Sequence, residues 1–179
     1  LEGSTTDQGS DPCTQGYYCE AGSDRVLCPS GRFCKEGSTT DQGTGPCAGG
    51  RYCLEGSTTD QGTGPCAEGR YCDEGSTSDL GSGPCPVGYW CPEGTSNTTK
   101  VPCPIGQYGS TTGNSLQYDA CSLCEGGRRS LEGDTAQGIP NKCTECESGK
   151  SSAAGAPLCY YVCDNGEYTD AGSSSGCSS

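Results

Sequence analysis

The sequence is dominated by a tandem repeat of 19 residues that carries two cysteines at fixed positions. Three complete copies follow one another at residues 35–53, 54–72 and 73–91, and the last reads DEGSTSDLGSGPCPVGYWC. Every copy keeps Gly, Pro, Cys and an aromatic residue at the same places. A repeat of this length predicts a quasi-one-dimensional array in which each unit touches only its neighbours.

The repeats extend beyond these three copies and fall into two parts. The first part, residues 1–102, also contains a complete unit, a shortened unit and a degenerate unit: 1–19, 20–34 and 92–102. In the second part, residues 103–179, the cysteines meet at C-x₂-C or C-x₃-C junctions. Leu1 is in register with Leu54, so we expect the chain to begin inside a longer array.

The composition leaves too little apolar material for a conventional core. Only 30% of the 179 residues are hydrophobic, and 18 of these are cysteines, with one Phe, one Trp and no Met. Disulfides then replace burial as the main stabiliser. The Gly, Ser, Thr, Asp and Pro of each unit favour turns, and no helical or strand periodicity is present. The sequence predicts a small disulfide-rich repeat array, an elongated rod of turns and short β-ribbons with essentially no helix.

Cysteine usage and charge restrict the location and the partners. An even and dense set of cysteines is typical of extracellular and cell-surface proteins. No apolar run is long enough to span a membrane, so we expect no direct membrane insertion. The net charge of −13 argues against nucleic acid as a partner.

Two disulfide schemes fit the cysteine spacing. A self-contained scheme uses all 18 cysteines: Cys13–Cys19, Cys28–Cys34, Cys47–Cys53, Cys66–Cys72, Cys85–Cys91, Cys103–Cys121, Cys124–Cys143, Cys146–Cys159 and Cys163–Cys177. The rival closes the longer loops of the first part: 19–28, 34–47, 53–66, 72–85 and 91–103. Residues 53–66 and 146–159 share C-x₂-G-x₅-G-x₃-C, which favours the rival there, whereas completeness favours the self-contained scheme. We adopt the self-contained scheme, and the spacing leaves the rival open.

Aromatic and charged residues recur at fixed positions of the unit. Position 18 is always aromatic, which predicts either a thin spine of rings beside the disulfides or an exposed ligand platform: Tyr18, Phe33, Tyr52, Tyr71 and Trp90. Arginines precede three of these rings, and a glutamate stands near the start of each unit, so Glu–Arg pairs between repeats are plausible: Arg32, Arg51 and Arg70. Exposed pairs of this kind contribute little.

Neither a metal site nor a catalytic site is indicated. The chain has no His, which disfavours zinc and general-base chemistry, and we expect every cysteine to be oxidised. Aspartates recur at one position of the unit, where they suit either a Ca²⁺ site or an Asx turn: Asp7, Asp41, Asp60 and Asp79. We favour the turn, and we predict no cofactor and no enzymatic activity.

The sequence also contains candidate glycosylation sites. Asn97-Thr98-Thr99 is an N-glycosylation sequon in a turn-rich loop. The Thr-rich loops offer sites for O-linked sugars on compositional grounds: Thr39, Thr40, Thr58 and Thr59.

Two segments carry a resemblance that extends over nearly the whole chain. CPVGYWC at 85–91, and CPIGQYGSTTG at 103–113 followed by C-x₂-C, resemble ephrin-receptor-like or TNF-receptor-like cysteine-rich repeats. Such repeats occur in receptor ectodomains and in large protist surface proteins, including mastigoneme-type flagellar hairs. The resemblance implies pairs 103–121, 124–143 and 146–159. Residues 20–34 are too short for the pattern, Cys163 follows a C-x₃-C, and no ligand-contact motif carries over.

Two functional hypotheses follow from these features. The first is a non-enzymatic extracellular structural protein, a segment of a filament or cell-surface coat, whose partners are other copies of itself, neighbouring repeats and glycans. The alternative is the stalk or ligand-binding ectodomain of a cell-surface receptor or adhesin. Only Tyr89-Trp90 and the cluster 160–162 diverge enough to serve as binding anchors. A small secreted inhibitor or toxin is disfavoured by the length and the uniform repetition.

Overall fold

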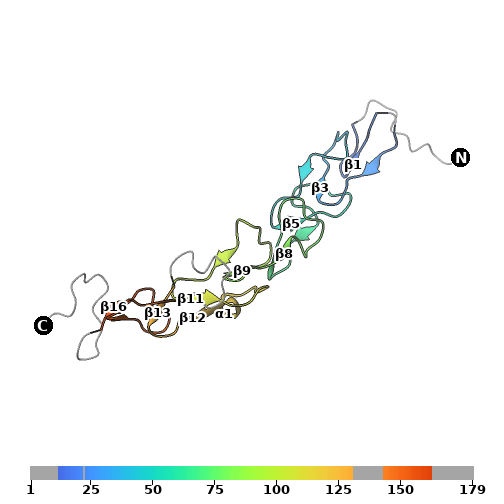
Figure 1. The fold of residues 1–179 in the computed structure, drawn as a ribbon. Helices are drawn as coiled ribbons and strands as arrows, with labels where there is room; N and C mark the ends of the chain where they lie inside the picture. The colour runs from blue at the N-terminus through green and yellow to red at the C-terminus, as the bar shows by residue number, and fades with distance from the viewer. Residues whose placement is uncertain (1–11, 22, 131–142, 163–179) are drawn as a thin grey trace. The chain divides into compact units, whose positions relative to one another are not determined.

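The computed structural model describes residues 12–21, 23–130 and 143–162 (Figure 1). The chain divides into two compact units, which we describe separately. The first unit comprises residues 1–84 and 91–100, and the second comprises 85–90 and 101–179.

Short strands in the described residues pair two by two, each with the next strand along the chain, as antiparallel ribbons. In the first unit the pairs are β1–β2 (Tyr17–Tyr18, Val26–Leu27), β3–β4 (Arg32–Phe33, Gly45–Pro46), β5–β6 (Arg51–Tyr52, Gly64–Pro65) and β7–β8 (Arg70–Tyr71, Gly83–Pro84). In the second they are β9–β10 (Tyr89–Trp90, Val101–Pro102), β11–β12 (Gln107–Gly109, Cys121–Leu123), β13–β14 (Arg128–Arg129, Thr144–Glu145) and β15–β16 (Lys150–Ser151, Tyr160–Tyr161). One four-residue helix, α1 (Gln117–Ala120), lies among the described residues. The protein is thus a small disulfide-rich repeat array of ribbons and turns with essentially no helix.

Three ribbons of the first unit, β3–β4, β5–β6 and β7–β8, place an aromatic ring over a glycine. In β5–β6, Tyr52 lies opposite Gly64, and a Cβ added to Gly64 would lie 3.3 Å from Cε1 of the Tyr52 ring. The same arrangement recurs for Phe33 with Gly45 and, more loosely, for Tyr71 with Gly83. The glycine of the repeated Gly-Pro pair therefore leaves room for the ring across the ribbon.

Cysteine side chains, rather than aromatic rings, make up most of the buried apolar residues in the described part of each unit. The cysteines with no exposed surface are Cys28, Cys34, Cys47, Cys53, Cys66, Cys72, Cys85, Cys91 and Cys124. Among the aromatic residues of position 18, Phe33 is buried, and Tyr18, Tyr52, Tyr71 and Trp90 are half-buried. The rings of Phe33, Tyr52 and Tyr71 each cover the glycine of their own ribbon, so these rings pack within their repeats beside a buried disulfide.

A ladder of backbone hydrogen bonds joins successive repeats of the first unit. The amide of Gly50 donates to the carbonyl of Cys72 at 2.8 Å, and the amide of Cys53 donates to the carbonyl of Ser76 at 3.0 Å. Equivalent bonds occur one repeat earlier and one repeat later: Gly31 to Cys53, Cys34 to Ser57, Gly69 to Cys91, and Cys72 to Thr95. If each repeat is taken to begin at the first cysteine of its disulfide, every one of these bonds joins a repeat to the next repeat along the chain.

Contacts also reach beyond the adjacent repeat, which corrects the expectation that each unit touches only its neighbours. A Cβ added to Gly50 would lie 2.2 Å from the carbonyl oxygen of Gly94, two repeats further on. Gly31 approaches Gly75 in the same way. The close approach is possible because glycine has no side chain at either place.

Candidate functional site: the repeated disulfide framework

Seven disulfides in the described residues join the cysteines of the self-contained scheme. They are Cys13–Cys19, Cys28–Cys34, Cys47–Cys53, Cys66–Cys72, Cys103–Cys121, Cys124–Cys143 and Cys146–Cys159. Cys85 and Cys91 are disulfide-bonded as well. The predicted pair Cys163–Cys177 lies outside the described residues. All five pairs of the rival scheme are wrong, because each requires a cysteine that one of these disulfides joins to a different partner.

The second part of the array uses the same framework with a different partner cysteine. In the first part, the first cysteine bonds the cysteine that ends its own C-x₅-C segment. In the second part, Cys103 instead bonds Cys121, which lies directly across the ribbon from Gly109. Gly109 lies six residues after Cys103, where a C-x₅-C segment of the first part has its second cysteine. The bridge therefore starts at the same place in both parts and ends on opposite strands of the ribbon.

Two buried serines occupy the same vacated place in the following repeats. Ser130 follows Cys124 as Cys53 follows Cys47, and its side chain has no exposed surface. Its Oγ accepts a hydrogen bond from the amide of Gly106 at 2.6 Å. Ser152 lies in the same position after Cys146, and its carbonyl accepts from the amide of Gly127 at 2.9 Å. The ladder thus continues through the second unit with serine in place of cysteine.

This register corrects the alignment of 146–159 with 53–66. Gly149 stands in the turn before a ribbon with φ of 81°, as Gly50 does with φ of 84°. Cys146 therefore corresponds to Cys47, the first cysteine of its segment. The pattern C-x₂-G-x₂-(C/S/G), rather than C-x₂-G-x₅-G-x₃-C, is the signal that identifies the equivalent residues.

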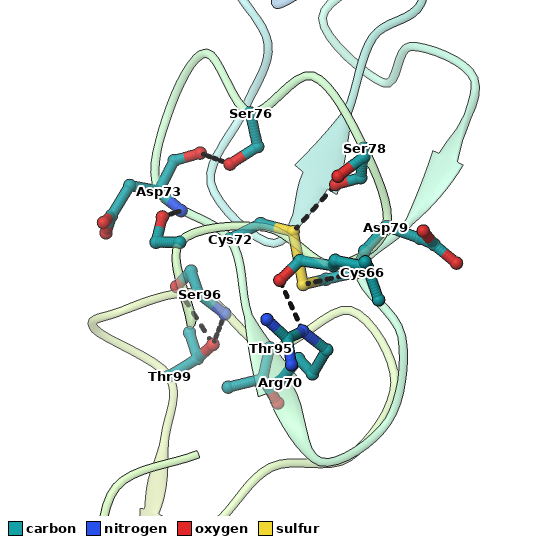
Figure 2. Close-up of a disulfide and its surroundings, with 12 residues drawn as sticks. Cys66, Arg70, Cys72, Asp73, Ser76, Ser78, Asp79, Thr95, Ser96 and Thr99 are labelled. Atoms are coloured by element: carbon teal, nitrogen blue, oxygen red, sulfur yellow. Dashed lines mark hydrogen bonds between the residues drawn. A yellow bond between two sulfur atoms is a disulfide. The ribbon is translucent and has the colours of Figure 1, made fainter. Parts of the chain in front are cut away.

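Each disulfide of the first part is enclosed by the loop that follows it, as Figure 2 shows for Cys66–Cys72. The carbonyl oxygen of Asp79 lies 3.4 Å from Sγ of Cys66. A glycine of the loop covers the bridge in three repeats, at Gly43, Gly62 and Gly81: a Cβ added to Gly62 would lie 2.8 Å or less from both sulfurs of Cys47–Cys53. No side chain larger than hydrogen fits at that place.

The repeated arginines stabilise the loops of their own repeats. Nε of Arg70, which Figure 2 shows, donates to the carbonyl of Leu80. Nε of Arg32 and Nε of Arg51 donate in the same way to the carbonyls of Gln42 and Gln61. These bonds span ten residues and fix the long loop against its ribbon. The guanidinium groups therefore bind backbone oxygens, which replaces the Glu–Arg pairing considered from the sequence.

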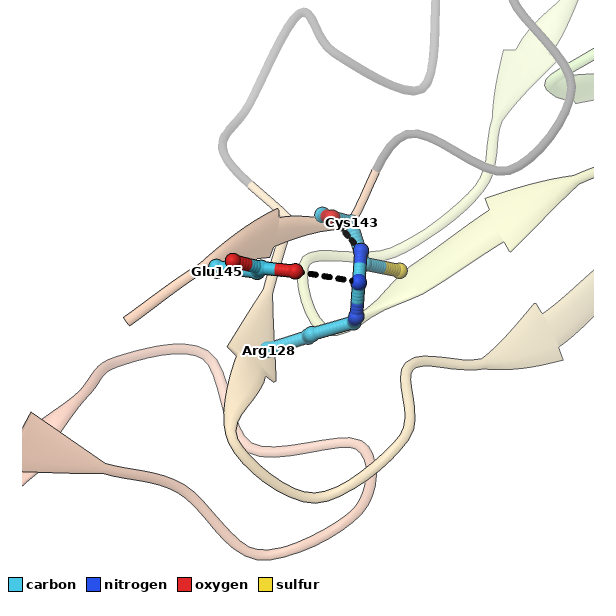
Figure 3. A network of polar contacts seen from close by, with 3 residues as sticks. All are labelled: Arg128, Cys143 and Glu145. Atoms are coloured by element: carbon cyan, nitrogen blue, oxygen red, sulfur yellow. Dashed lines mark hydrogen bonds and ion pairs between the residues drawn. The ribbon is translucent and has the colours of Figure 1, made fainter. Parts of the chain in front are cut away.

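A polar contact of another kind lies in the second unit. Arg128 of β13 lies opposite Glu145 of β14, and its Nη2 is 2.6 Å from Oε1 of that glutamate (Figure 3). Nη1 of Arg128 also donates to the carbonyl of Cys143 at 3.1 Å. Arg128 and Cys143, with Tyr108 and Glu125, border an open pocket of about 310 Å³. The glutamate is largely exposed, so the pair itself contributes little.

The recurrent aspartates contribute backbone atoms to the fold. The carbonyls of Asp60 and Asp79 accept hydrogen bonds from the amides of Ala48 and Ala67 at 2.9 Å, and all three described aspartates are exposed. Within residues 12–21, 23–130 and 143–162, no three acidic or cysteine side chains gather into a possible metal site. Asp7 lies outside the described residues.

Asn97 of the sequon is exposed in a tight turn. The amide of Thr99 donates to the carbonyl of Ser96 at 3.2 Å, and the amide of Ser96 donates to Oγ1 of Thr99 at 2.8 Å. Nζ of Lys100 donates to Oδ1 of Asn97. The turn thus presents the asparagine side chain at the surface.

The two proposed anchor clusters differ in exposure. Tyr89 and Trp90 are half-buried in β9. Tyr161 and Val162 are exposed, and Nζ of Lys150 lies 4.9 Å from the centroid of the Tyr161 ring. Only the second cluster offers an open apolar surface.

Comparison with known proteins assigns no relative to this array. No protein-family model matches the sequence, and no curated protein is significantly similar to it. No helix in the described part of the chain is long and apolar enough to cross a membrane. The dense disulfides are typical of an extracellular or secreted protein stabilised by its bridges.

Proposed function

We propose that this protein is a non-enzymatic structural segment of an extracellular filament or cell-surface coat, built from repeats that resemble ephrin-receptor-like modules. The backbone ladder supports this proposal. Gly50 and its equivalents make the same bond to the following repeat each time, so the stack can be lengthened without changing any contact. Such an array presents the same surface many times along one chain.

Repetition of one surface favours association with other copies. A weak contact made by a single repeat is multiplied when adjacent repeats engage together, because each later contact is intramolecular. The net charge of −13 limits unspecific aggregation, which leaves ordered contacts between copies or with neighbouring repeats of a longer chain. A glycan on exposed Asn97 further restricts which faces can meet.

Electron microscopy of the native material, non-reduced and with sugars intact, tests this function. We expect regular filaments or a regular coat whose axial repeat matches this segment. The control is the same material after reduction, which loses the bridges and with them the regular order. Single molecules that stay unassociated over a wide concentration range would contradict the proposal.

The stalk of a receptor or adhesin is a second candidate, and the second unit provides the observation that favours it. Most exposed large apolar side chains of the described residues lie there: Ile105, Leu116, Tyr118, Leu123, Leu158, Tyr161 and Val162. A soluble partner that binds this unit, with affinity reduced by Tyr161→Ser and unchanged by Leu54→Ser, would support this function. Both residues are exposed, so the pair of variants is matched.

A further inference from the structure

The hydroxyl groups of the repeated loops divide into those that hold the backbone and those that do not. At position 4 of the unit, Oγ donates to the carbonyl three residues earlier, as Ser57 does to Leu54 at 2.7 Å. At position 10, the hydroxyl accepts from the amide of position 1, as Thr63 does from Leu54 at 2.9 Å. The same bonds recur in neighbouring repeats for Ser38, Thr44, Ser76 and Ser82.

The threonine at position 6 belongs to the other class. Thr40 and Thr59 are exposed, and their carbonyls accept from the amides of Gly43 and Gly62 at 2.9 and 3.0 Å. Their hydroxyls take part in no hydrogen bond within the described part of the chain. The backbone of this turn is therefore fixed, whereas the hydroxyl has no structural partner. An alanine or valine would satisfy the same turn.

The threonine at position 5 is exposed in one repeat, at Thr39, and less accessible in the other. Thr58 is half-buried, and its Cγ2 lies 3.3 Å from the place of a Cβ on Gly16. Position 6 is therefore the place where both repeats, and not one alone, present an exposed and unused threonine hydroxyl on a rigid turn.

We propose that Thr40 and Thr59 are sites of O-linked glycosylation. The hydroxyl oxygen attacks the anomeric carbon of a nucleotide-activated sugar, the bond from that carbon to the nucleotide phosphate breaks, and the hydroxyl proton passes to a base of the transferase. The products are a threonine glycoside and a nucleoside phosphate. This inference does not depend on the filament function, because a receptor stalk would carry the same turns.

Charge selects a sugar over a phosphate at these hydroxyls. Thr40 precedes Asp41, Thr59 precedes Asp60, and both aspartates are exposed. A phosphate would add further negative charge beside each carboxylate in a chain whose net charge is already −13. A neutral sugar adds no such repulsion. The disulfides place the chain in the oxidising compartments where protein glycosylation occurs.

The test is site-resolved mass spectrometry of the protein purified from the cells that make it. After reduction of the disulfides, trypsin releases residues 36–51 and 52–70, and each peptide carries one copy of the loop. We expect the mass of a hexose, deoxyhexose or N-acetylhexosamine on both peptides, localised by fragmentation to Thr40 and Thr59. Localisation on the unchanged protein requires no variant, so the test survives a variant that is not secreted.

Two double variants produced in the same cells provide the matched comparison. Thr40→Val with Thr59→Val should lose the sugar from both peptides. Thr44→Val with Thr63→Val removes hydroxyls of the same loops that already bind amides, and it should keep the sugar. Unmodified peptides from the native protein, a phosphate mass, or sugar on Thr44 and Thr63 instead would overturn the proposal.

Discussion

At the scale of single residues, Gly50 and Gly149 separate two reasons for requiring glycine. Both stand at the same place of the repeat, with φ of 84° and 81°. A Cβ on Gly50 would collide with the carbonyl of Gly94, whereas a Cβ on Gly149 would meet nothing within 4 Å. Gly50 is therefore required both for its positive φ and for its close packing against Gly94, whereas Gly149 is required for its positive φ alone.

We predict that Gly149→Ala costs about 1–2 kcal/mol of unfolding free energy, which is the cost of a positive φ for a residue with a side chain. Gly50→Ala should cost roughly 1–3 kcal/mol more, because the backbone two repeats away must move. Chemical denaturation of the oxidised protein measures both values. Equal losses would contradict the close packing of Gly50 against Gly94.

Ser130 is the second residue on which the framework depends. It is fully buried and accepts the amide of Gly106, so its removal leaves a buried donor without a partner. Ser122 lies in β12, is exposed, and serves as a control.

We expect Ser130→Ala to cost about 1–3 kcal/mol, the penalty for an unsatisfied buried amide. Ser122→Ala should stay within about 0.5 kcal/mol of the original protein. Thermal or denaturant unfolding of both variants is the measurement. A neutral Ser130→Ala would show that another group satisfies the amide of Gly106.

At the scale of elements, the ribbon explains what could and could not be predicted from the sequence. The spacing of Cys47 and Cys53, the Gly-Pro pair and the scarcity of apolar residues were enough to predict short ribbons stapled by disulfides. The same features were not enough to choose between the two disulfide schemes, because a cysteine such as Cys53 has a possible partner cysteine both before and after it in the sequence. The equivalence of Ser130 with a cysteine was also missed, because it depends on a buried hydrogen bond from the amide of Gly106 in the preceding repeat.

The Arg70 contact shows the same limitation. The glutamates that recur near the start of each unit suggested an acidic partner for the arginines, but the folded loop brings the carbonyl of Leu80 to Arg70 from ten residues away. Loop conformation, rather than spacing, decides which oxygen the guanidinium meets.

The turn before β15 provides a prediction on pH. Nζ of Lys150 donates to Oε2 of Glu147 at 3.0 Å, and this hydrogen bond, with the attraction between the charges, lowers the pKa of Glu147. The folded state therefore binds this proton less readily than the unfolded state. The small stabilisation is present above the unfolded pKa and is lost as the pH falls through the lowered value.

Nuclear magnetic resonance titration of the Glu147 carboxyl should show this lowered midpoint. Lys150→Gln should return the midpoint towards its ordinary value, since both effects come from the ammonium group. Salt should have a similar but weaker effect, because the pair is exposed. A midpoint that Lys150→Gln leaves unchanged would rule out the contact in solution.

At the scale of the whole molecule, disulfides and the backbone ladder stabilise different things. A bridge that closes a C-x₅-C segment stabilises by roughly 2 kcal/mol, and one that closes the longer loops of the second part by roughly 3 kcal/mol. These bridges hold each repeat. The ladder joins one repeat to the next, and its bonds are the same wherever the repeat stands. Repeats of the first part should therefore be interchangeable.

Deletion of residues 54–72 tests this central claim most directly. The deletion removes one complete repeat and joins Cys53 to Asp73, which stands where Leu54 stood. The amide of Gly50 should then donate to the carbonyl of Cys91 in place of Cys72. We predict that hydrogen exchange at the Gly50 amide stays as slow as in the original chain, with the remaining disulfides unchanged. Exchange at the rate of an open loop would show that the repeats are not equivalent and would contradict the account of an open-ended array.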